Sequence, residues 1–237
     1  MASFELIPVV DLMGGVVVHA RAGERDRYLP LTGSRLCASA EPVAVVRGLL
    51  GLFPFRQLYL ADLDAIRRLG GDHRATIRAL REEFPELRLW VDAAFTGACS
   101  CRGFIGAGLG ELVLGSESQA DLRQVELLQD ERSWVLSLDY RGDTPLGPPG
   151  LFATPALWPE RVIVMTLARV GSGHGPDLDR LRAIRALAPD RRVYAAGGVR
   201  GEADLLALRE LGCAGALVAS ALHDGRLDRA ALDRLAV

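Results

Sequence analysis

Two aspartates, Asp11 and Asp139, each end an apolar run of the sequence, IPVVD at 7–11 and VLSLD at 135–139. Two carboxyl groups at one site can transfer protons, one as a base and the other as an acid, when their surroundings separate their pKa values. Each aspartate could instead cap a loop at the end of a strand. Which role applies depends on where the fold places the two residues.

Three glycine-containing or serine-ended turns in the second half of the chain could bind phosphate. Residues 194–200 read YAAGGVR, residues 171–175 read GSGHG, and residues 218–220 read VAS. Adjacent glycines let backbone amides approach an anion, and the positive end of a following helix adds to the attraction. Plain tight turns would also explain the glycines, but three such loops together favour phosphate. The candidate ligands are Gly173, Gly197, Gly198 and Ser220.

Short apolar runs alternate with amphipathic stretches along the chain, which is typical of a parallel α/β fold. Most runs are apolar throughout, as expected for strands that are covered on both faces. The eight predicted strands are 5–11, 57–62, 87–92, 111–115, 134–139, 162–166, 193–196 and 216–219. Helical periodicity is clearest at 73–84, 119–129, 178–187, 202–211 and 227–235. Two longer insertions interrupt the pattern, a hairpin and loop expected at 21–40 and an irregular segment at 142–159.

The residues at the strand ends distinguish a closed barrel from an open sheet. All are polar or glycine, namely Asp11, Asp62, Asp92, Ser116, Asp139, Thr166, Gly197 and Ser220. Barrel enzymes take reactive groups from the carboxyl ends of many strands, whereas a Rossmann sheet gathers its ligands at one switch point after G-x-G-x-x-G. No such fingerprint follows Asp11. We therefore predict a single (β/α)8 TIM barrel over residues 1–237, with a weak half-barrel pseudo-repeat.

The composition argues against several classes of partner. The formal net charge is −2 and the arginines are scattered, so nucleic acid is not expected as a partner. The apolar run at 43–53 is too short for a membrane span, and residues 1–5 lack a secretion signal, so we expect a cytoplasmic protein. The four cysteines lack the paired spacing of a zinc site, so no metal is expected. The oligomeric state stays open.

These motifs, in this order, resemble the histidine-biosynthesis barrels, a family that includes ProFAR isomerase (HisA) and the cyclase of imidazole-glycerol-phosphate synthase (HisF). Residues 7–18, IPVVDLMGGVVV, are similar to the opening of that family, and LADL at 60–63 to its second strand. SLDYRG at 137–142 looks like the isomerase more than the cyclase. AAGGV at 195–199 is similar to the C-terminal phosphate loop. The resemblance spans nearly the whole chain and implies a barrel of the ribulose-phosphate-binding type.

The resemblance implies an Amadori-type aldose–ketose isomerisation of a sugar phosphate, with no metal or organic cofactor. Asp11 would remove the C2 proton of the sugar, Asp139 would act as general acid in ring opening, and Thr166 would support it. The family's substrate carries a second phosphate, and Gly115 and Ser116 would form part of the site that binds it.

Two loops depart from the family pattern. VDAAFTG at 91–97 stands where a glycine-rich, basic loop normally binds a second phosphate, and Asp92 would repel a phosphate dianion. LARVGS at 167–172 replaces an acidic stretch, so Arg169 is a candidate ligand for an acidic group or, equally, the partner of a strand-end aspartate such as Asp62 or Asp139. The departures resemble paralogues of methanogens and methylotrophs that accompany C1-carrier (methanofuran, tetrahydromethanopterin) pathways, and they fit a substrate with one phosphate.

Three hypotheses remain open. The first is an isomerase of a phosphorylated small molecule. The second is a HisF-like cyclase or lyase with an ammonia-supplying partner; the absence of lysine counts against it, with His19 near the position where the family usually has a basic residue. The third is a non-catalytic barrel that binds a phosphorylated ligand or a protein partner, which the retention of both Asp11 and Asp139 disfavours. Further candidate substrate contacts are Asp62, Asp92, Arg169 and His174, whereas His19, His73 and His223 are expected in packing or surface roles.

Overall fold

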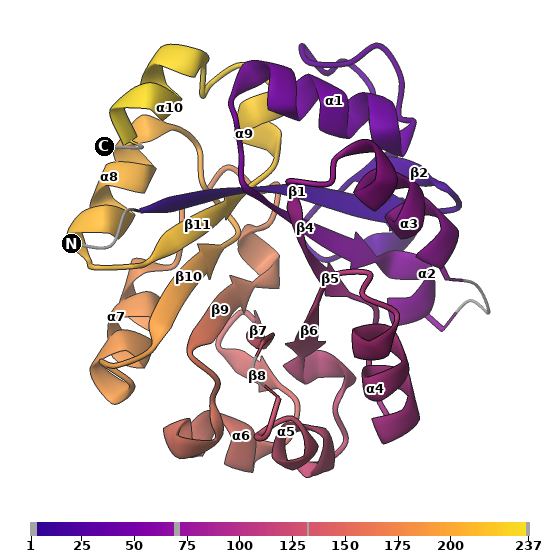
Figure 1. Cartoon of the computed structure of the whole chain (residues 1–237). Helices are drawn as coiled ribbons and strands as arrows, with labels where there is room; N and C mark the ends of the chain where they lie inside the picture. Colours follow the sequence, from indigo (N-terminus) through magenta and orange to yellow (C-terminus); the bar gives the residue numbers. More distant parts are fainter. Residues whose placement is uncertain (1–3, 69–71, 132, 236–237) are drawn as a thin grey trace.

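Eight parallel strands close into a barrel with helices around its outside (Figure 1). The computed structural model describes residues 4–68, 72–131 and 133–235. The last barrel strand pairs with the first, from Glu5↔Gly215 to Pro8↔Val218, which completes the wall. In order around the barrel the strands are β1 (Glu5–Met13), β4 (Gln57–Asp62), β5 (Arg88–Asp92), β6 (Glu111–Gly115), β7 (Trp134–Arg141), β9 (Arg161–Thr166), β10 (Arg192–Ala196) and β11 (Gly215–Val218). The predicted TIM barrel is confirmed, and each predicted strand matches an observed one to within two residues.

Two apolar layers stabilise the barrel. Alternate strand residues point inward and fill the barrel, among them Ile7, Trp90 and Tyr194. The rings of Trp90 and Tyr194 meet edge to face with their centroids 5.0 Å apart. The intervening residues, such as Val10 and Leu136, pack outward against the helices. Because both faces are covered, the strands are apolar throughout.

The helices lie between successive strands. They are α1 (Pro42–Leu52), α2 (Leu63–Ile66), α3 (Arg74–Glu83), α4 (Ala98–Gly106), α5 (Arg123–Leu127), α6 (Pro149–Ala153), α7 (Leu178–Leu187), α8 (Glu202–Glu210), α9 (Ser220–His223) and α10 (Arg229–Leu235). Four of the five predicted helices are found to within two residues. The fifth, 119–129, is shorter because a 3-10 turn, η2 (Ser116–Ser118), and an irregular segment precede α5. Helices α1 and α4 and the short helices α2, α6 and α9 lie outside the predicted set.

The two insertions extend from the ends of β1 and β7. After β1 the chain turns back as β2 (Val16–His19), which pairs antiparallel with β1, and continues through the 3-10 turn η1 (Arg25–Arg27) to β3 (Leu29–Pro30). The expected hairpin is thus present, but its first strand precedes residue 21. After β7 the chain forms β8 (Thr144–Leu146), antiparallel to β7, then α6 and the 3-10 turn η3 (Pro155–Leu157).

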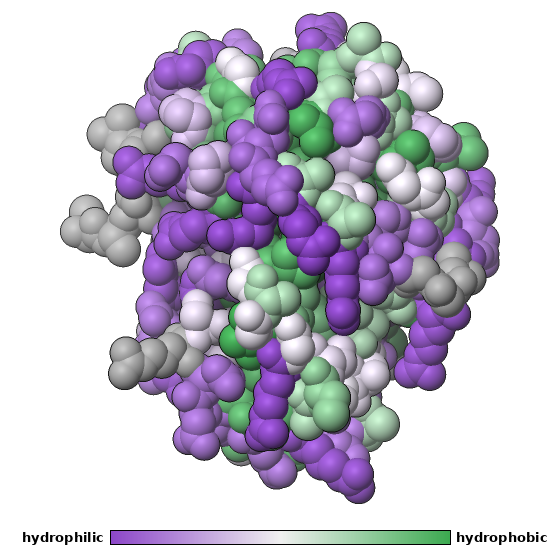
Figure 2. Space-filling view, turned by 45° about the vertical axis from the view of Figure 1, so that its right-hand side comes forward, coloured by the Kyte–Doolittle hydropathy of each residue, from purple (hydrophilic) through white to green (hydrophobic). Residues whose placement is uncertain are grey.

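The surface is mostly polar. Figure 2 shows hydrophilic side chains over much of the face that it displays, with apolar residues between them. Within the described residues, the exposed large apolar side chains are those of Leu29 and Leu187. No helix in that part of the chain has the length and hydropathy needed to cross a membrane.

Candidate active site

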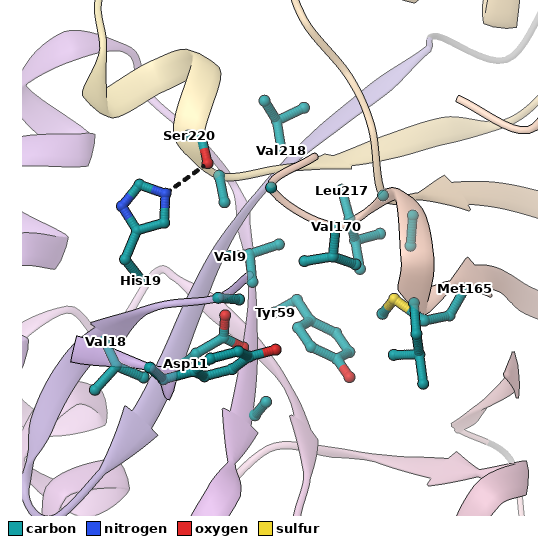
Figure 3. Close-up of a pocket in the computed structure, with 18 of the residues that line it drawn as sticks. Val9, Asp11, Val18, His19, Tyr59, Met165, Val170, Leu217, Val218 and Ser220 are labelled. Atoms are coloured by element: carbon teal, nitrogen blue, oxygen red, sulfur yellow. Dashed lines mark hydrogen bonds between the residues drawn. The ribbon is translucent and has the colours of Figure 1, made fainter. Parts of the chain in front are cut away.

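A cavity of about 320 Å³ opens at the carboxyl ends of the barrel strands (Figure 3). Active sites of TIM barrels lie at this face. One part of its wall, which we call the carboxylate half, carries Asp92, Glu117 and Asp139. Another part, the glycine half, is formed by Gly173, Gly197, Gly198 and Ser220.

Asp11 faces the cavity from β1, with Tyr59 nearby (Figure 3). No residue in the described ranges donates a hydrogen bond to its carboxylate. Burial raises the pKa of Asp11 to about 7, and the positive charge of Arg25 opposes that rise only in part. A carboxyl group with a pKa near the working pH is suited to serve as a general base.

Asp139 lies across the barrel mouth from Asp11, because three strands separate β1 from β7 in either direction around the wall. Ser137 Oγ donates to Asp139 Oδ1 at 2.6 Å, and the Glu117 amide donates to Oδ2 at 3.0 Å. Ser116 Oγ accepts from the Asp139 amide at 2.8 Å. Burial, followed by the negative charge of Glu117, raises the pKa of Asp139 to about 7 despite the Ser137 hydrogen bond. This aspartate is therefore held firmly, unlike Asp11.

Asp92 lies close to Asp139, with Gly115 beside both. A Cβ atom on Gly115 would lie 2.9 Å from Asp92 Oδ2 and 3.4 Å from Asp139 Oδ2, so any side chain there would press on the carboxylates. The Tyr59 hydroxyl donates to Asp92 Oδ2 at 3.4 Å, and the Ala94 amide donates to Oδ1 at 3.1 Å. Burial raises the pKa of Asp92 to about 6. Asp92 thus contributes a third carboxyl group that titrates near neutral pH.

Arg25 and Glu117 are functional candidates that sequence reasoning missed. The guanidinium of Arg25, in η1, pairs with the Glu117 carboxylate, which follows β6, and both side chains line the cavity. A hydrogen bond of 2.7 Å from the Ala22 amide to the Val170 carbonyl fastens the same insertion to the loop after β9. The insertion therefore reaches across the barrel mouth. The length of segment 21–40 was the available signal, since long loops in compact domains are often functional.

The glycines of the glycine half allow backbone segments to approach one another closely. Gly197 and Gly198 have φ of +96° and +90°, which residues with a Cβ rarely adopt. A Cβ on Gly197 would lie 2.9 Å from the Thr166 carbonyl oxygen, and one on Gly198 would lie 2.2 Å from that of Gly175. These two glycines thus bring the loops after β9 and β10 together at the cavity.

Basic side chains border the glycine half. His19 Nε2 lies 3.1 Å from Ser220 Oγ (Figure 3). His223 and Arg226 also line the cavity. Burial, followed by the charge of His19, lowers the pKa of His223 to about 4, so His223 is neutral at neutral pH. The histidines at 19 and 223 therefore belong to the cavity wall, in addition to the packing or surface roles expected for them.

Thr166 and Asp62 do not line the cavity. On β9 it is Met165 that faces the cavity, so Thr166 points the other way, and its hydroxyl donates to Asp177 Oδ2 at 3.2 Å. The His73 amide donates to Asp62 Oδ2 at 2.7 Å, and His73 Nδ1 lies 2.8 Å from Asp62 Oδ1. Both side chains therefore connect a strand end to the segment that follows it.

The remaining predicted contacts are also partly engaged elsewhere. Arg169 Nη1 donates to the His174 carbonyl at 3.0 Å, so this guanidinium closes its own loop, and the His174 side chain is exposed outside the wall. Ser116 is buried, and its hydroxyl is occupied by Asp139. Neither Ser116 nor Gly115 lines the cavity. The position expected for a second phosphate is thus taken by carboxylates.

The side chains of the cavity include carboxyl groups, which can transfer protons, and basic groups, which can bind an anion. Within residues 4–68, 72–131 and 133–235, no cluster of three or more His, Cys, Asp or Glu side chains has the arrangement of a metal site. The four cysteines are free thiols.

Comparison with known proteins points to the same family as the sequence motifs. A family model described as "Histidine biosynthesis protein" matches residues 154–228. A ProFAR isomerase of Rubrobacter xylanophilus is 29% identical, with 94% of this chain and 93% of that protein covered. The chain is thus similar to HisA (ProFAR isomerase) proteins over nearly its whole length. Among its other relatives are a ProFAR isomerase of a Synechococcus strain, 28% identical over 95% of this chain and 91% of that protein, and an uncharacterized protein of Methanocaldococcus jannaschii, 27% identical over 94% and 95%.

The match to the family model falls unevenly on the cavity. Residues 154–228 include all four members of the glycine half. They exclude Asp11 and the whole carboxylate half, Asp92, Glu117 and Asp139. The family model therefore covers the glycine half of the cavity, whereas the listed relatives align over nearly the whole chain.

Proposed function

We propose that this protein is an acid–base isomerase that carries out an aldose–ketose (Amadori-type) rearrangement on a phosphorylated small molecule. The observation that carries the proposal is the placement of Asp11 and Asp139 on opposite strands around one cavity, with the pKa of each raised to about 7. Paired carboxyl groups of this kind can share acid and base roles at neutral pH.

The glycine half would hold the phosphate. The loops after β9 and β10 meet there through Gly197 and Gly198, next to Gly173 and Ser220. Loops at this position of TIM barrels recurrently bind phosphate. His19, beside Ser220, would add a hydrogen bond. A phosphate anchored at this point would place the sugar carbons between the two aspartates.

In this reaction the two aspartates would carry the first two proton transfers. Protonated Asp139 gives its proton to the ring oxygen of an aminoaldose as the C1–O bond breaks and the nitrogen lone pair forms a C1=N iminium. Ionised Asp11 takes the C2 proton, and the C2–H electron pair forms a C1=C2 double bond while the iminium nitrogen regains its lone pair. A proton added at C1, together with loss of the proton from the C2 hydroxyl, gives the ketone at C2. C2 is oxidised and C1 is reduced, so no external oxidant is required.

Thr166 would act at one remove in this scheme. Its hydroxyl is bound to Asp177, and Thr166 pairs in register with Tyr140, the neighbour of Asp139. The supporting role that the resemblance implies would therefore be to position the end of β9 against β7.

A second candidate is the same chemistry on a monophosphorylated substrate of C1-carrier metabolism, as the resemblance to methanogen and methylotroph paralogues implies. The observation that favours it is the occupation of the second phosphate position by Asp92 and Asp139, beside Gly115.

Complementation of a histidine auxotroph that lacks ProFAR isomerase separates the two candidates. Growth that depends on both Asp11 and Asp139 would support the histidine isomerase. No growth, together with turnover of a monophosphorylated aminoaldose by the purified protein, would support the second candidate. A folded protein that neither restores growth nor binds inorganic phosphate would refute the proposed function.

A further inference from the structure

The hydrogen-bond donors of the carboxylate half are already engaged by carboxylates. The Ala94 amide donates to Asp92 at 3.1 Å, and the Glu117 amide donates to Asp139 at 3.0 Å. These amides belong to the loops after β5 and β6, where a second anion would need donors. The Ser116 hydroxyl donates to Asp139 Oδ2 at 3.3 Å and accepts from the Asp139 amide at 2.8 Å. An anionic group would therefore have to displace a carboxylate to be bound there.

The charge of this half is also unfavourable for an anion. Burial, followed by the charges of Asp92, Asp139, Asp11 and Glu117, holds the pKa of the Tyr59 hydroxyl well above its ordinary value. Four carboxyl groups thus act on the Tyr59 hydroxyl, and Asp92 accepts its hydrogen bond. Arg25 brings a positive charge near them, and its guanidinium is paired with Glu117.

We propose, on the basis of the proposed function, that Asp92 selects a phosphate monoester whose other end carries a protonated amine. An ammonium group brings three donors and no acceptor, which matches a wall of carboxylate oxygens. With its phosphate in the glycine half, such a molecule would place its amine against Asp92. A second phosphate at that end is rejected.

The expected discrimination follows from the charges. Two unit charges about 6 Å apart, at an effective dielectric constant of about 20, change a binding constant by about 100-fold. Because the cavity is open to solvent, we expect about 10-fold to 100-fold for each change of charge at the far end.

Three probes that share one phosphate and one carbon chain test the proposal: butyl phosphate, aminobutyl phosphate and butanediol bisphosphate. Their dissociation constants are measured by calorimetry at about pH 7.5, where Asp92 is ionised and the amine is protonated. The wild-type protein should bind aminobutyl phosphate at least about 10-fold more tightly, and the bisphosphate at least about 10-fold more weakly, than butyl phosphate.

The affinities of aminobutyl phosphate and of the bisphosphate each differ from that of butyl phosphate, and we call these two differences the gaps. Asp92→Asn should reduce both gaps, because it removes the charge of the side chain and keeps its shape. Asp190→Asn, at a surface carboxylate that pairs with Arg191 and is 70% exposed, is the matched control and should leave both gaps unchanged. The comparison of the three probes on the wild-type protein remains decisive even if Asp92→Asn fails to fold.

The possible failures are distinguishable. If butyl phosphate binds but the bisphosphate binds equally well or better, the role of Asp92 is refuted and the proposed function stands. If none of the three probes binds, the phosphate site is absent, and both the inference and the proposed function fall. Equal gaps in wild type and Asp92→Asn would transfer the selectivity to another residue and overturn the assignment.

Discussion

Replacement of Asp11 by asparagine is expected to stabilise the fold increasingly as the pH rises. Burial raises the pKa of Asp11 from 3.8 to about 7, so the folded protein retains a proton there that the unfolded chain releases. The stability that this group contributes is complete below about pH 3.8 and is lost as the pH rises through about 7. Asparagine does not titrate. The stability difference between the variant and the wild type should therefore grow across this window.

The magnitude follows from the same values. The difference between 3.8 and about 7 corresponds to about 4 kcal/mol at high pH, because one pKa unit is worth about 1.4 kcal/mol. About 2.6 kcal/mol of this change falls between about pH 5 and pH 8. Because Asp11 lines a cavity that is open to solvent, we expect the advantage of Asp11→Asn to increase by about 1–2.6 kcal/mol over that range.

Urea unfolding of both proteins at about pH 5 and pH 8 measures this increase. The control, Asp190→Asn, should change the free energy of unfolding by the same amount at both pH values, to within about 0.5 kcal/mol. In a contrary outcome, the free energies of unfolding of Asp11→Asn and wild type differ by the same amount at both pH values, or by less at pH 8. Either result would show that burial does not raise the pKa of Asp11.

Three further predictions concern the site. Gly198→Ala should weaken the binding of inorganic phosphate at least about 10-fold, because the new Cβ would lie 2.2 Å from a carbonyl oxygen. The control Gly103→Ala, with no atom within 4 Å of its new Cβ, should leave the affinity unchanged. Calorimetry compares the two variants, and equal affinities would contradict the phosphate site. The pH profile of kcat/KM should be bell-shaped with its optimum near 7, because Asp11 must be ionised and Asp139 protonated, each with a pKa of about 7; a flat profile would contradict these roles. Arg25→Gln should move the acidic limb of that profile to higher pH, because the charge of Arg25 lowers the pKa of Asp11; a limb that stays in place would separate Arg25 from the base.

The barrel and the position of the two aspartates could be predicted because they depend on local patterns. Strands that are buried on both faces appear in the sequence as continuous apolar runs. The carboxyl ends of the parallel strands all lie at the same end of the barrel. Asp11, Asp92 and Asp139 end such runs, and all three line the cavity. Gly197 and Gly198 were likewise legible, since adjacent glycines after a strand mark a close approach of backbones.

The direction of each strand-end side chain could not be predicted from the strand alone. Successive residues of a strand point to opposite faces, so an error of one position exchanges the cavity for the outside. On β9 the side chain of Met165 lines the cavity, and the hydroxyl of Thr166 donates to Asp177 outside it. Asp62 similarly turns to His73.

Arg25 and Glu117 were beyond sequence reasoning for a different reason. They are 92 residues apart, and their pairing depends on the path of an insertion across the barrel mouth. That path is set by tertiary contacts such as the hydrogen bond from Ala22 to Val170. No local periodicity encodes such contacts.

Proton transfer at carbon tests the proposed function most directly. A ribosylamine phosphate, prepared from ribose phosphate and a primary amine, is incubated with the protein in deuterated water and followed by NMR. The wild-type protein should form the ketose with solvent deuterium at C1. Asp11→Asn and Asp139→Asn should each be slower by about 100-fold or more, and Asp190→Asn should match the wild type. Wild-type rates in either active-site variant, or no reaction of the wild-type protein with this compound or with ProFAR, would contradict the assignment of Asp11 and Asp139 as an acid–base pair.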